Sequence, residues 1–146
     1  MNDIEAICRL KARYFRTLDT RDWQGFRDVF TSDVVVDTTD DGGERVSGVE
    51  EFMTYLNENL AGATTVHQGH MPEIDVLSES TAAGIWTMSD IVIWTNGVRL
   101  DGYGHYHEFY VKAEGQWRIK SLTLTRLYTE FSDPGRKDVR QAVDSD

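Results

Sequence analysis

Apolar residues recur along the chain at two different periods, and the change of period divides it into a helical first part and a strand-rich remainder. Residues 3–18 have the three-and-four spacing of one helical face, and the residues on that face are Ile4, Ile7, Cys8, Lys11, Tyr14, Phe15 and Leu18. Asn2, with Glu5 three residues later, resembles a capping box at the start of this helix. A second, shorter helix over residues 22–30 is predicted from an apolar side made by Trp23, Phe26, Val29 and Phe30.

The third helix is predicted from the segment "SGVEEFMTYLNENLAG". Ser47 and Glu50 have the spacing of a capping box, and Gly62 ends the pattern. The apolar stripe of this helix consists of Val49, Phe52, Met53, Leu56 and Leu60. Ahead of it, "VVVD" at residues 34–37 predicts a strand, and "TTDDGGERV" is typical of a turn into a second short strand.

Four long strands are predicted after Thr64, over residues 64–77, 81–95, 99–113 and 116–129. The short turns "SES", "TNG" and "AEG" join them, and Asn96-Gly97 is a strong hairpin signal. Helices followed by a meander of antiparallel strands predict an α+β fold, with the helices packed on one face of a curved sheet. We expect a single domain over residues 1–131 and a polar C-terminal tail over 132–146.

Charge and composition narrow the classes of function. The chain has 146 residues and a formal net charge of −10, which argues against nucleic acid and anionic membranes as partners. Cys8 is the single cysteine, so an internal disulfide is excluded. Neither a signal-peptide pattern nor an apolar run near the ~20 residues of a membrane span is found, and we expect a cytoplasmic protein.

The four histidines are candidates for chemistry or for a metal. His67 and His70 are three residues apart, so a regular strand directs them to opposite faces, and a shared metal ion is not expected there. His105 and His107 share a face and form the better metal candidate, or else a polar part of the sheet surface. We expect no metal site and no cofactor.

Three charged residues lie in unusual places. Asp90 shares the parity of Trp86, Met88 and Val92, so it is a buried acid, unless it is a surface strand acid or an acid satisfied by a backbone donor. Asp19 either caps the helix over 22–30 or orients a histidine at the mouth of a pocket. Arg126, in the hydrophobic strand "LTLTRLY", binds an anionic or carbonyl group of a ligand or pairs with Asp90 or Asp19.

Residues 2–130 resemble the SnoaL-like group of the nuclear transport factor 2-like superfamily. The resemblance rests on the helices around "ARYFRTLDTRDWQGFRDVF" and "VSGVEEF", and on the strands "VHQGHMPEIDV" and "GQWRIKSLTLTRLY". It implies a cone-shaped, mostly antiparallel curved sheet closed by three N-terminal helices.

Several enzymes of this superfamily use an Asp–His pair, among them scytalone dehydratase, bile acid 7α-dehydratase and hexachlorocyclohexane dehydrochlorinase. In the bile acid dehydratases a Tyr precedes the Asp by five residues, the His follows the Asp after 48, and a second Asp follows after 23 more. Tyr14, Asp19, His67 and Asp90 reproduce this spacing, and Arg126 lies near the position of an arginine in the last strand. The epoxide hydrolases of the fold use an Asp–Arg–Asp set without this histidine and fit less well.

The resemblance implies a cofactor-independent lyase or isomerase of dehydratase type. His67 would be the general base, Asp19 its partner, and Tyr14 and Asp90 would lie at the same cavity. The residues expected to contact a hydrophobic substrate, including polycyclic steroids or polyketides, are Arg126, Trp86, Met88, Phe15 and Trp23. The alternatives are a noncatalytic binding protein, and a partner subunit similar to the small subunit of ring-hydroxylating dioxygenases.

A homo-oligomer, either a dimer or a trimer, is also expected. The long strands predict an apolar outer sheet face that a single layer of helices does not cover. The residues assigned to that outer face are Tyr106, Tyr110, Leu122 and Leu124.

Overall fold

Three α-helices and a seven-stranded sheet form the described part of the chain, which in this computed structural model comprises residues 1–135 and 139–141. In chain order the elements are α1 (Asp3–Asp19), α2 (Trp23–Arg27), β1 (Phe30–Asp37), the 3-10 turn η1 (Thr39–Asp41), β2 (Arg45–Ser47), α3 (Val49–Leu60), β3 (Thr64–Val76), β4 (Thr81–Ile93), β5 (Arg99–Ala113), β6 (Gln116–Ser132) and β7 (Val139–Gln141).

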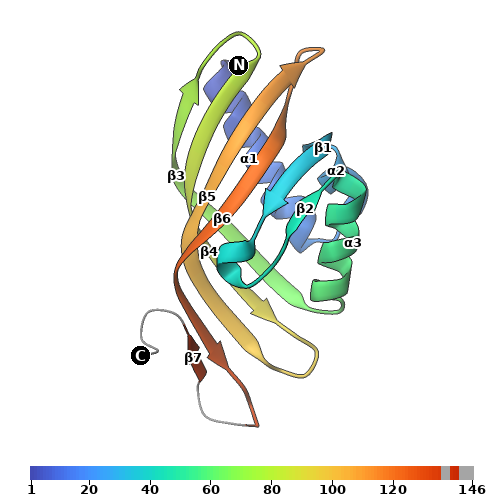
Figure 1. Ribbon diagram of the computed structural model, residues 1–146, viewed down its shortest axis with the longest axis vertical. Coiled ribbons are helices and arrows are strands. Elements are labelled where there is room, and N and C mark those ends of the chain that lie inside the picture. The colour runs from blue at the N-terminus through green and yellow to red at the C-terminus, as the bar shows by residue number, and fades with distance from the viewer. Residues whose placement is uncertain (136–138, 142–146) are drawn as a thin grey trace.

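The sheet is long and strongly curved, and the N-terminal helices pack against it (Figure 1). Its strand order is β2-β1-β6-β5-β4-β3, with β7 added beside β6. Every pairing is antiparallel except that of β1 with β6, which is parallel. The predicted α+β fold with a curved, mostly antiparallel sheet is therefore confirmed, although β2 and β3 stand at opposite ends of the order and the sheet stays open.

Of the two capping boxes predicted at helix starts, the structure confirms one and contradicts the other. The backbone N–H of Glu5 donates to Asn2 Oδ1 at 2.8 Å, so the predicted cap of α1 is confirmed. The capping box predicted at Ser47 is wrong, because Ser47 belongs to β2 and pairs with Val35. Gly48 takes the N-cap position instead, at a φ of +94° that a side chain would strain.

The core lies between the helices and the covered face of the sheet. It contains the four residues that the sequence placed on the outer face, Tyr106, Tyr110, Leu122 and Leu124, which are all at most 6% exposed. That prediction is wrong, because alternation groups residues on one face without telling which face the helices cover. The argument for a homo-oligomer loses this basis, and the oligomeric state stays a prediction.

A buried ion pair crosses this core. Lys11 of α1 and Glu108 of β5 pair through Nζ and Oε2, with both side chains fully buried. Tyr110 donates its hydroxyl to Glu108 Oε1 at 2.6 Å, and the Trp86 indole N–H donates to Tyr110 at 2.9 Å. The Lys11 ammonium also lies 3.5 Å from the centre of the Tyr14 ring. Burial lowers the pKa of Lys11 to about 8, although Glu108 opposes this change.

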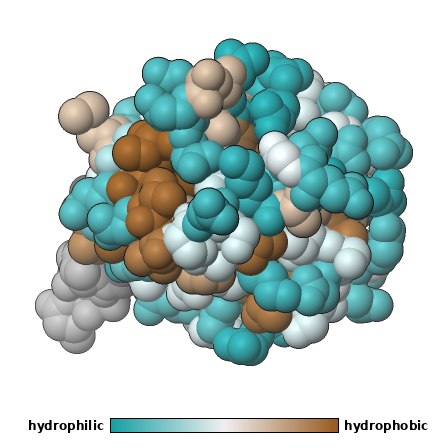
Figure 2. Space-filling view, turned by 90° about the horizontal axis from the view of Figure 1, so that it is seen from above, coloured by the Kyte–Doolittle hydropathy of each residue, from teal (hydrophilic) through white to brown (hydrophobic). Residues whose placement is uncertain are grey.

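The face shown in Figure 2 is predominantly hydrophilic, and its apolar side chains gather mainly on the left of the view. Within the described residues, no helix combines the length and the apolar character needed to cross a membrane. Of the predicted polar tail, residues 136–138 and 142–146 lie outside the described residues. Residues 139–141 form β7, which pairs with Thr129–Phe131 of β6.

Candidate active site

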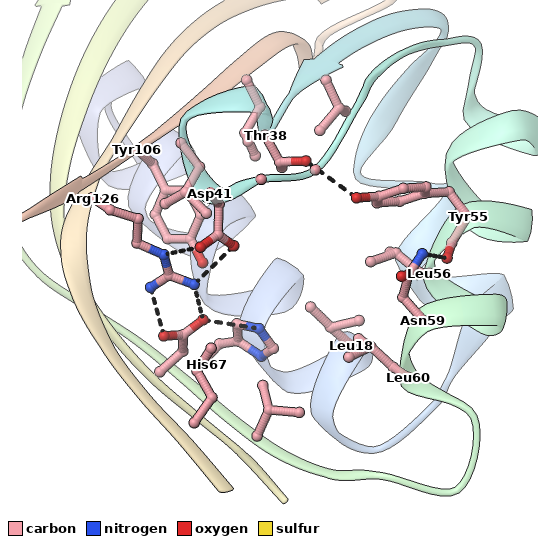
Figure 3. A pocket seen from close by; sticks show the side chains of 18 of the residues that line it. Leu18, Thr38, Asp41, Tyr55, Leu56, Asn59, Leu60, His67, Tyr106 and Arg126 are labelled. Atoms are coloured by element: carbon pink, nitrogen blue, oxygen red, sulfur yellow. Dashed lines mark hydrogen bonds and ion pairs between the residues drawn. The ribbon is translucent and has the colours of Figure 1, made fainter. Parts of the chain in front are cut away.

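A cavity of about 370 Å³ opens between the sheet, η1 and α3. Figure 3 shows Asp41, His67 and Arg126 on one side of it, and Leu56 and Leu60 of α3 on the opposite side. The volume lies within the usual range of small-molecule pockets. The cavity therefore offers a charged wall and an apolar wall to one bound molecule.

Asp19 and His67 meet at the charged wall. Asp19 is the last residue of α1, and His67 points inward from β3 next to it. Asp19 Oδ1 lies 2.7 Å from His67 Nδ1, and Asp19 Oδ2 accepts the backbone N–H of His67 at 2.8 Å. A carboxylate only accepts, so Nδ1 carries a proton, and in the neutral imidazole the lone pair is on Nε2. The His67 side chain is 10% exposed, which limits its contact with water.

Thr65 and Arg21 hold the Asp19 carboxylate in this position. Thr65 donates its hydroxyl to Asp19 Oδ1 at 2.9 Å, and Arg21 Nη1 donates to the Thr65 oxygen at 2.9 Å. Arg21 also donates to the carbonyls of Leu18 and Ala63 at 2.8 and 2.7 Å. Its backbone has a φ of +60°, an unfavourable conformation for a residue with a side chain. The Asp19–His67 contact is thus built into the turn after α1.

Asp90 and Arg126 form the second polar contact of the site. Arg126 Nη1 donates to Asp90 Oδ1 at 2.8 Å, and Nη2 donates to Asp90 Oδ2 at 3.0 Å. The two residues come from β4 and β6 and meet across Gly102 of β5. A Cβ on Gly102 would lie only 2.2 Å from Arg126 Nη1 and 2.4 Å from Asp90 Oδ1. The absence of a side chain at residue 102 therefore makes room for the ion pair.

Arg126 has a second carboxylate partner in η1. Its Nε and Nη2 donate to Asp41 Oδ1 and Oδ2 at 2.8 and 3.2 Å. Its backbone N–H donates to Asp40 Oδ2 at 2.7 Å, at a bulge where Leu127 is the extra residue of β6. Burial opposes the charge of the guanidinium, but the hydrogen bonds to Asp90 and Asp41 outweigh this effect and raise its pKa above the usual value.

Two buried phenols complete the polar part of the lining, Tyr14 from α1 and Tyr106 from β5. Their rings meet edge to face, with centroids 5.8 Å apart. Burial raises the pKa of Tyr14 and of Tyr106 well above the usual value for a phenol. Both hydroxyls therefore stay protonated, and because the two phenols are hydrogen-bonded to each other, one of the two protons is left to donate to a ligand.

The structure brings together most of the predicted site residues. His67 Nε2 lies 3.9 Å from Asp90 Oδ2, so Asp19, His67, Asp90 and Arg126 form one connected array, with Tyr14 at the same cavity. Their catalytic and substrate-binding roles stay predictions. Of the alternatives left open, Asp90 is the buried acid and Arg126 is its partner. Asp22, rather than Asp19, caps α2.

Trp86, Met88, Phe15 and Trp23 do not line this cavity. Trp86 is held by Tyr110, and Met88 packs beneath Arg126, with Sδ 3.7 Å from Nη1. The Phe15 ring lies against the backbone of Gly69, and Trp23 packs edge to face on Phe26. The expected contacts of these four side chains with substrate thus have no support in the cavity, because each one is packed against other parts of the protein.

Sequence reasoning missed Asp41, Thr65 and Arg21 as parts of the site. Asp41 lies in "TTDDGGERV", where acidic residues are ordinary turn formers. Thr65 has the inward parity of His67, and that signal was available. No sequence pattern pointed to Arg21, because its contacts depend on how the turn after α1 meets the end of α3.

The remaining histidines lie away from the cavity. His70 is exposed and precedes a bulge in β3, where Met71 has a φ of +33°. His105 and His107 share the outer sheet face, and His107 Nε2 lies 3.1 Å from Thr125 Oγ1. Among residues 1–135 and 139–141, no three His, Cys, Asp or Glu side chains are grouped so as to hold a metal ion.

Comparison with known proteins agrees with this architecture. A family model described as SnoaL-like domain matches residues 1–123. A protein of Gibberella zeae named "Probable cyclase FGR4" is 25% identical over 134 residues, covering 84% of this chain and 89% of that protein.

Solved structures share the fold at lower identity. A hexachlorocyclohexane dehydrochlorinase (LinA) of type 2 superposes with a TM-score of 0.80 at 16% identity, covering 97% of this chain and 94% of that one. A protein of Novosphingobium aromaticivorans, provisionally named a scytalone dehydratase, superposes with a TM-score of 0.77 at 22% identity, covering 99% and 95%. At these identities the likeness establishes the fold.

Proposed function

Because the chain belongs to the SnoaL-like domain family, we propose that it is a cofactor-independent lyase or isomerase acting on a hydrophobic small molecule. The observation that carries the proposal is the Asp19–His67 contact of 2.7 Å at the wall of a cavity with both polar and apolar lining. The names of similar proteins, a cyclase, a dehydratase and a dehydrochlorinase, support the same general kind of chemistry.

In this proposal His67 is the general base. Nε2 takes a proton from the carbon next to a substrate carbonyl; the C–H electron pair forms a carbon–carbon double bond, and the π pair of the carbonyl moves to its oxygen to give an enolate. Asp19, bonded to Nδ1, stabilises the imidazolium that forms, and Asp90 lies 3.9 Å from the protonated Nε2. A hydroxyl of Tyr14 or Tyr106 donates to the enolate oxygen, where negative charge develops.

The same proton then completes one of two reactions. In a dehydration, the enolate re-forms its carbonyl, a β-hydroxyl departs with the proton from His67, and the products are water and a conjugated double bond. In an isomerisation, His67 returns the proton to another carbon. Both routes restore neutral His67, and neither involves a net oxidation or reduction.

The test combines a substrate panel with a matched pair of variants. Uncharged fused-ring β-hydroxy ketones are incubated with the protein in D₂O, and mass spectrometry records loss of water and uptake of deuterium. His67→Ala should lower turnover by about 10²-fold or more, the usual scale for losing a general base. His105→Ala, on the outer face of β5, is the matched control and should retain full activity.

Two outcomes would contradict the proposal. If His67→Ala matches the native protein in turnover, His67 is not the base. If ligands bind tightly, are unchanged by the protein and bind equally well to His67→Ala, the noncatalytic binding protein becomes the better interpretation. Copurification with a larger oxygenase subunit would favour the partner-subunit alternative.

A further inference from the structure

Arg126 has no N–H group left for a ligand. A guanidinium carries five N–H donors. Nε donates to Asp41, Nη2 donates to Asp41 and Asp90, and Nη1 donates to Asp90 and to the sulfur of Met88. The Arg126 side chain is only 7% exposed. The positive residue at the cavity wall is therefore already neutralised and closed off by the protein itself.

The charges at this wall sum to a negative value. Asp19, Asp40, Asp41 and Asp90 are four carboxylates, and they stand against the two guanidinium groups of Arg21 and Arg126 and the imidazole of His67. The balance is negative whether His67 is neutral or protonated. The whole chain carries a formal charge of −10, which adds to the repulsion of an anion approaching the cavity.

The rest of the lining suits an uncharged molecule. Besides the charged groups, apolar side chains line the cavity, including Leu18 of α1, Leu56 and Leu60 of α3, and Trp94, Leu100 and Phe131 from the sheet side. Polar contacts come from the phenols of Tyr14 and Tyr106 and from Tyr55 and Asn59. Phenol hydroxyls can donate to a neutral carbonyl oxygen, and this contact requires no counter-charge.

From these observations we infer that the cavity selects uncharged, carbonyl-bearing apolar molecules over carboxylates of the same shape, and that Asp41 is the residue that sets this selection. The inference rests on the proposed function, which identifies this cavity as the active site, and it adds the class of substrate that the cavity would accept. Asp41 acts by filling the face of Arg126 that a ligand carboxylate would otherwise bind in a bidentate contact.

The position of Asp41 is itself held by the fold. The preceding residue, Asp40, accepts the backbone N–H of Arg126 at 2.7 Å. At the start of η1, Asp37 accepts the backbone N–H and the hydroxyl of Thr39 at 3.0 and 2.7 Å. A ligand anion would have to displace the carboxylate of Asp41, which accepts two hydrogen bonds from Arg126. The residues before Asp41 in η1 are themselves held by hydrogen bonds, which keeps this carboxylate in place.

The experiment compares two flat probes of similar shape, 2-acetylnaphthalene, which is neutral, and 2-naphthoate, which is an anion. Isothermal titration calorimetry at fixed ionic strength measures both dissociation constants. The native protein should bind the ketone at least about tenfold more tightly, because 2-naphthoate brings a negative charge up to the carboxylates of this wall. Asp41→Asn should reduce this ratio several-fold. Asp33→Asn removes an exposed carboxylate that pairs with Lys120, and as the matched control it should leave the ratio unchanged.

Equal or tighter binding of 2-naphthoate by the native protein would overturn the inference, and so would failure of the protein to bind either probe. An unchanged ratio in a folded Asp41→Asn variant would remove Asp41 from the role. Failure of the proposed function would be a separate result, because it is measured as turnover and not as binding. His67→Ala should keep the preference for the ketone over 2-naphthoate, so this inference can hold even if the protein shows no turnover.

Discussion

The carboxylate of Asp19 holds His67 at two points. Its Oδ1 lies 2.7 Å from ring Nδ1, and its Oδ2 accepts the backbone N–H of His67 at 2.8 Å. The two contacts fix both the strand and the imidazole relative to the end of α1. Because Nδ1 is bonded to an acceptor, the neutral imidazole has its lone pair on Nε2. The geometry of this pair therefore determines the protonation pattern on which the proposed chemistry depends.

Asp19→Asn should change the tautomer of His67. An amide can present N–H to Nδ1, which would move the ring proton to Nε2 and remove the base from the cavity. We expect ¹⁵N NMR to show the ring proton on Nδ1 in the native protein and on Nε2 in the variant, and turnover to fall by about 10²-fold or more. Asp22→Asn, at the N-cap of α2, should leave the tautomer unchanged. Native-like ring spectra in Asp19→Asn would contradict the assigned role.

Gly102→Ala should separate Asp90 from Arg126. The added Cβ would lie within 2.4 Å of both partners, so at least one of the buried charges must lose the contact. We expect a loss of about 3 kcal/mol in the free energy of unfolding, the lower end of the cost of breaking a buried pair. Urea denaturation followed by circular dichroism measures this change.

The control for that substitution is Gly135→Ala, because the nearest atom to a Cβ there is 3.5 Å away and the residue has no positive φ. It should change stability by no more than about 0.5 kcal/mol. If Gly102→Ala has an equally small effect, the close approach at Gly102 does not constrain the ion pair.

Removing one partner of the Lys11–Glu108 pair should lower the free energy of unfolding more than removing both partners. Lys11→Met leaves the Glu108 carboxylate buried without its counter-ion, a change that costs about 3–5 kcal/mol. Replacing Glu108 by Gln in the Lys11→Met background removes the unpaired charge and should recover part of that loss. A double-mutant cycle from urea unfolding gives the coupling energy, and additive effects would show that the pair is not coupled.

Three of the six tyrosines should resist alkaline titration. Burial raises the pKa values of Tyr14, Tyr106 and Tyr110 above the usual phenol value of about 10. Because the folded pKa exceeds the unfolded one, the stability linked to these phenols is fully present below pH ~10 and is lost as pH rises toward the folded values. Phenolate absorbance near 295 nm should therefore show a late step that coincides with unfolding by circular dichroism. Complete titration before any loss of structure would contradict the burial of these phenols.

The sequence by itself determined most of the elements and the parity of the site residues, although the helix predicted over 22–30 is shorter, with Phe30 already in β1, and β7 lies in the predicted tail. The change from a helical period to long alternating strands predicted the fold class, and the inward parity shared by Trp86, Met88 and Asp90 agrees with the structure. Local periodicity determines such features, because each depends on neighbours within a few residues. The spacing of Asp19 and His67 indicated the pair through resemblance to a family.

Only the tertiary structure decided which face is inside and what completes the site. Tyr106 and Leu122 share a face by alternation, but the packing of the helices decides that this face is buried. Asp41 reaches Arg126 from a turn 85 residues away in sequence. That contact depends on the parallel pairing of β1 with β6 and on the bulge at Leu127, and no local pattern in the sequence encodes either of them.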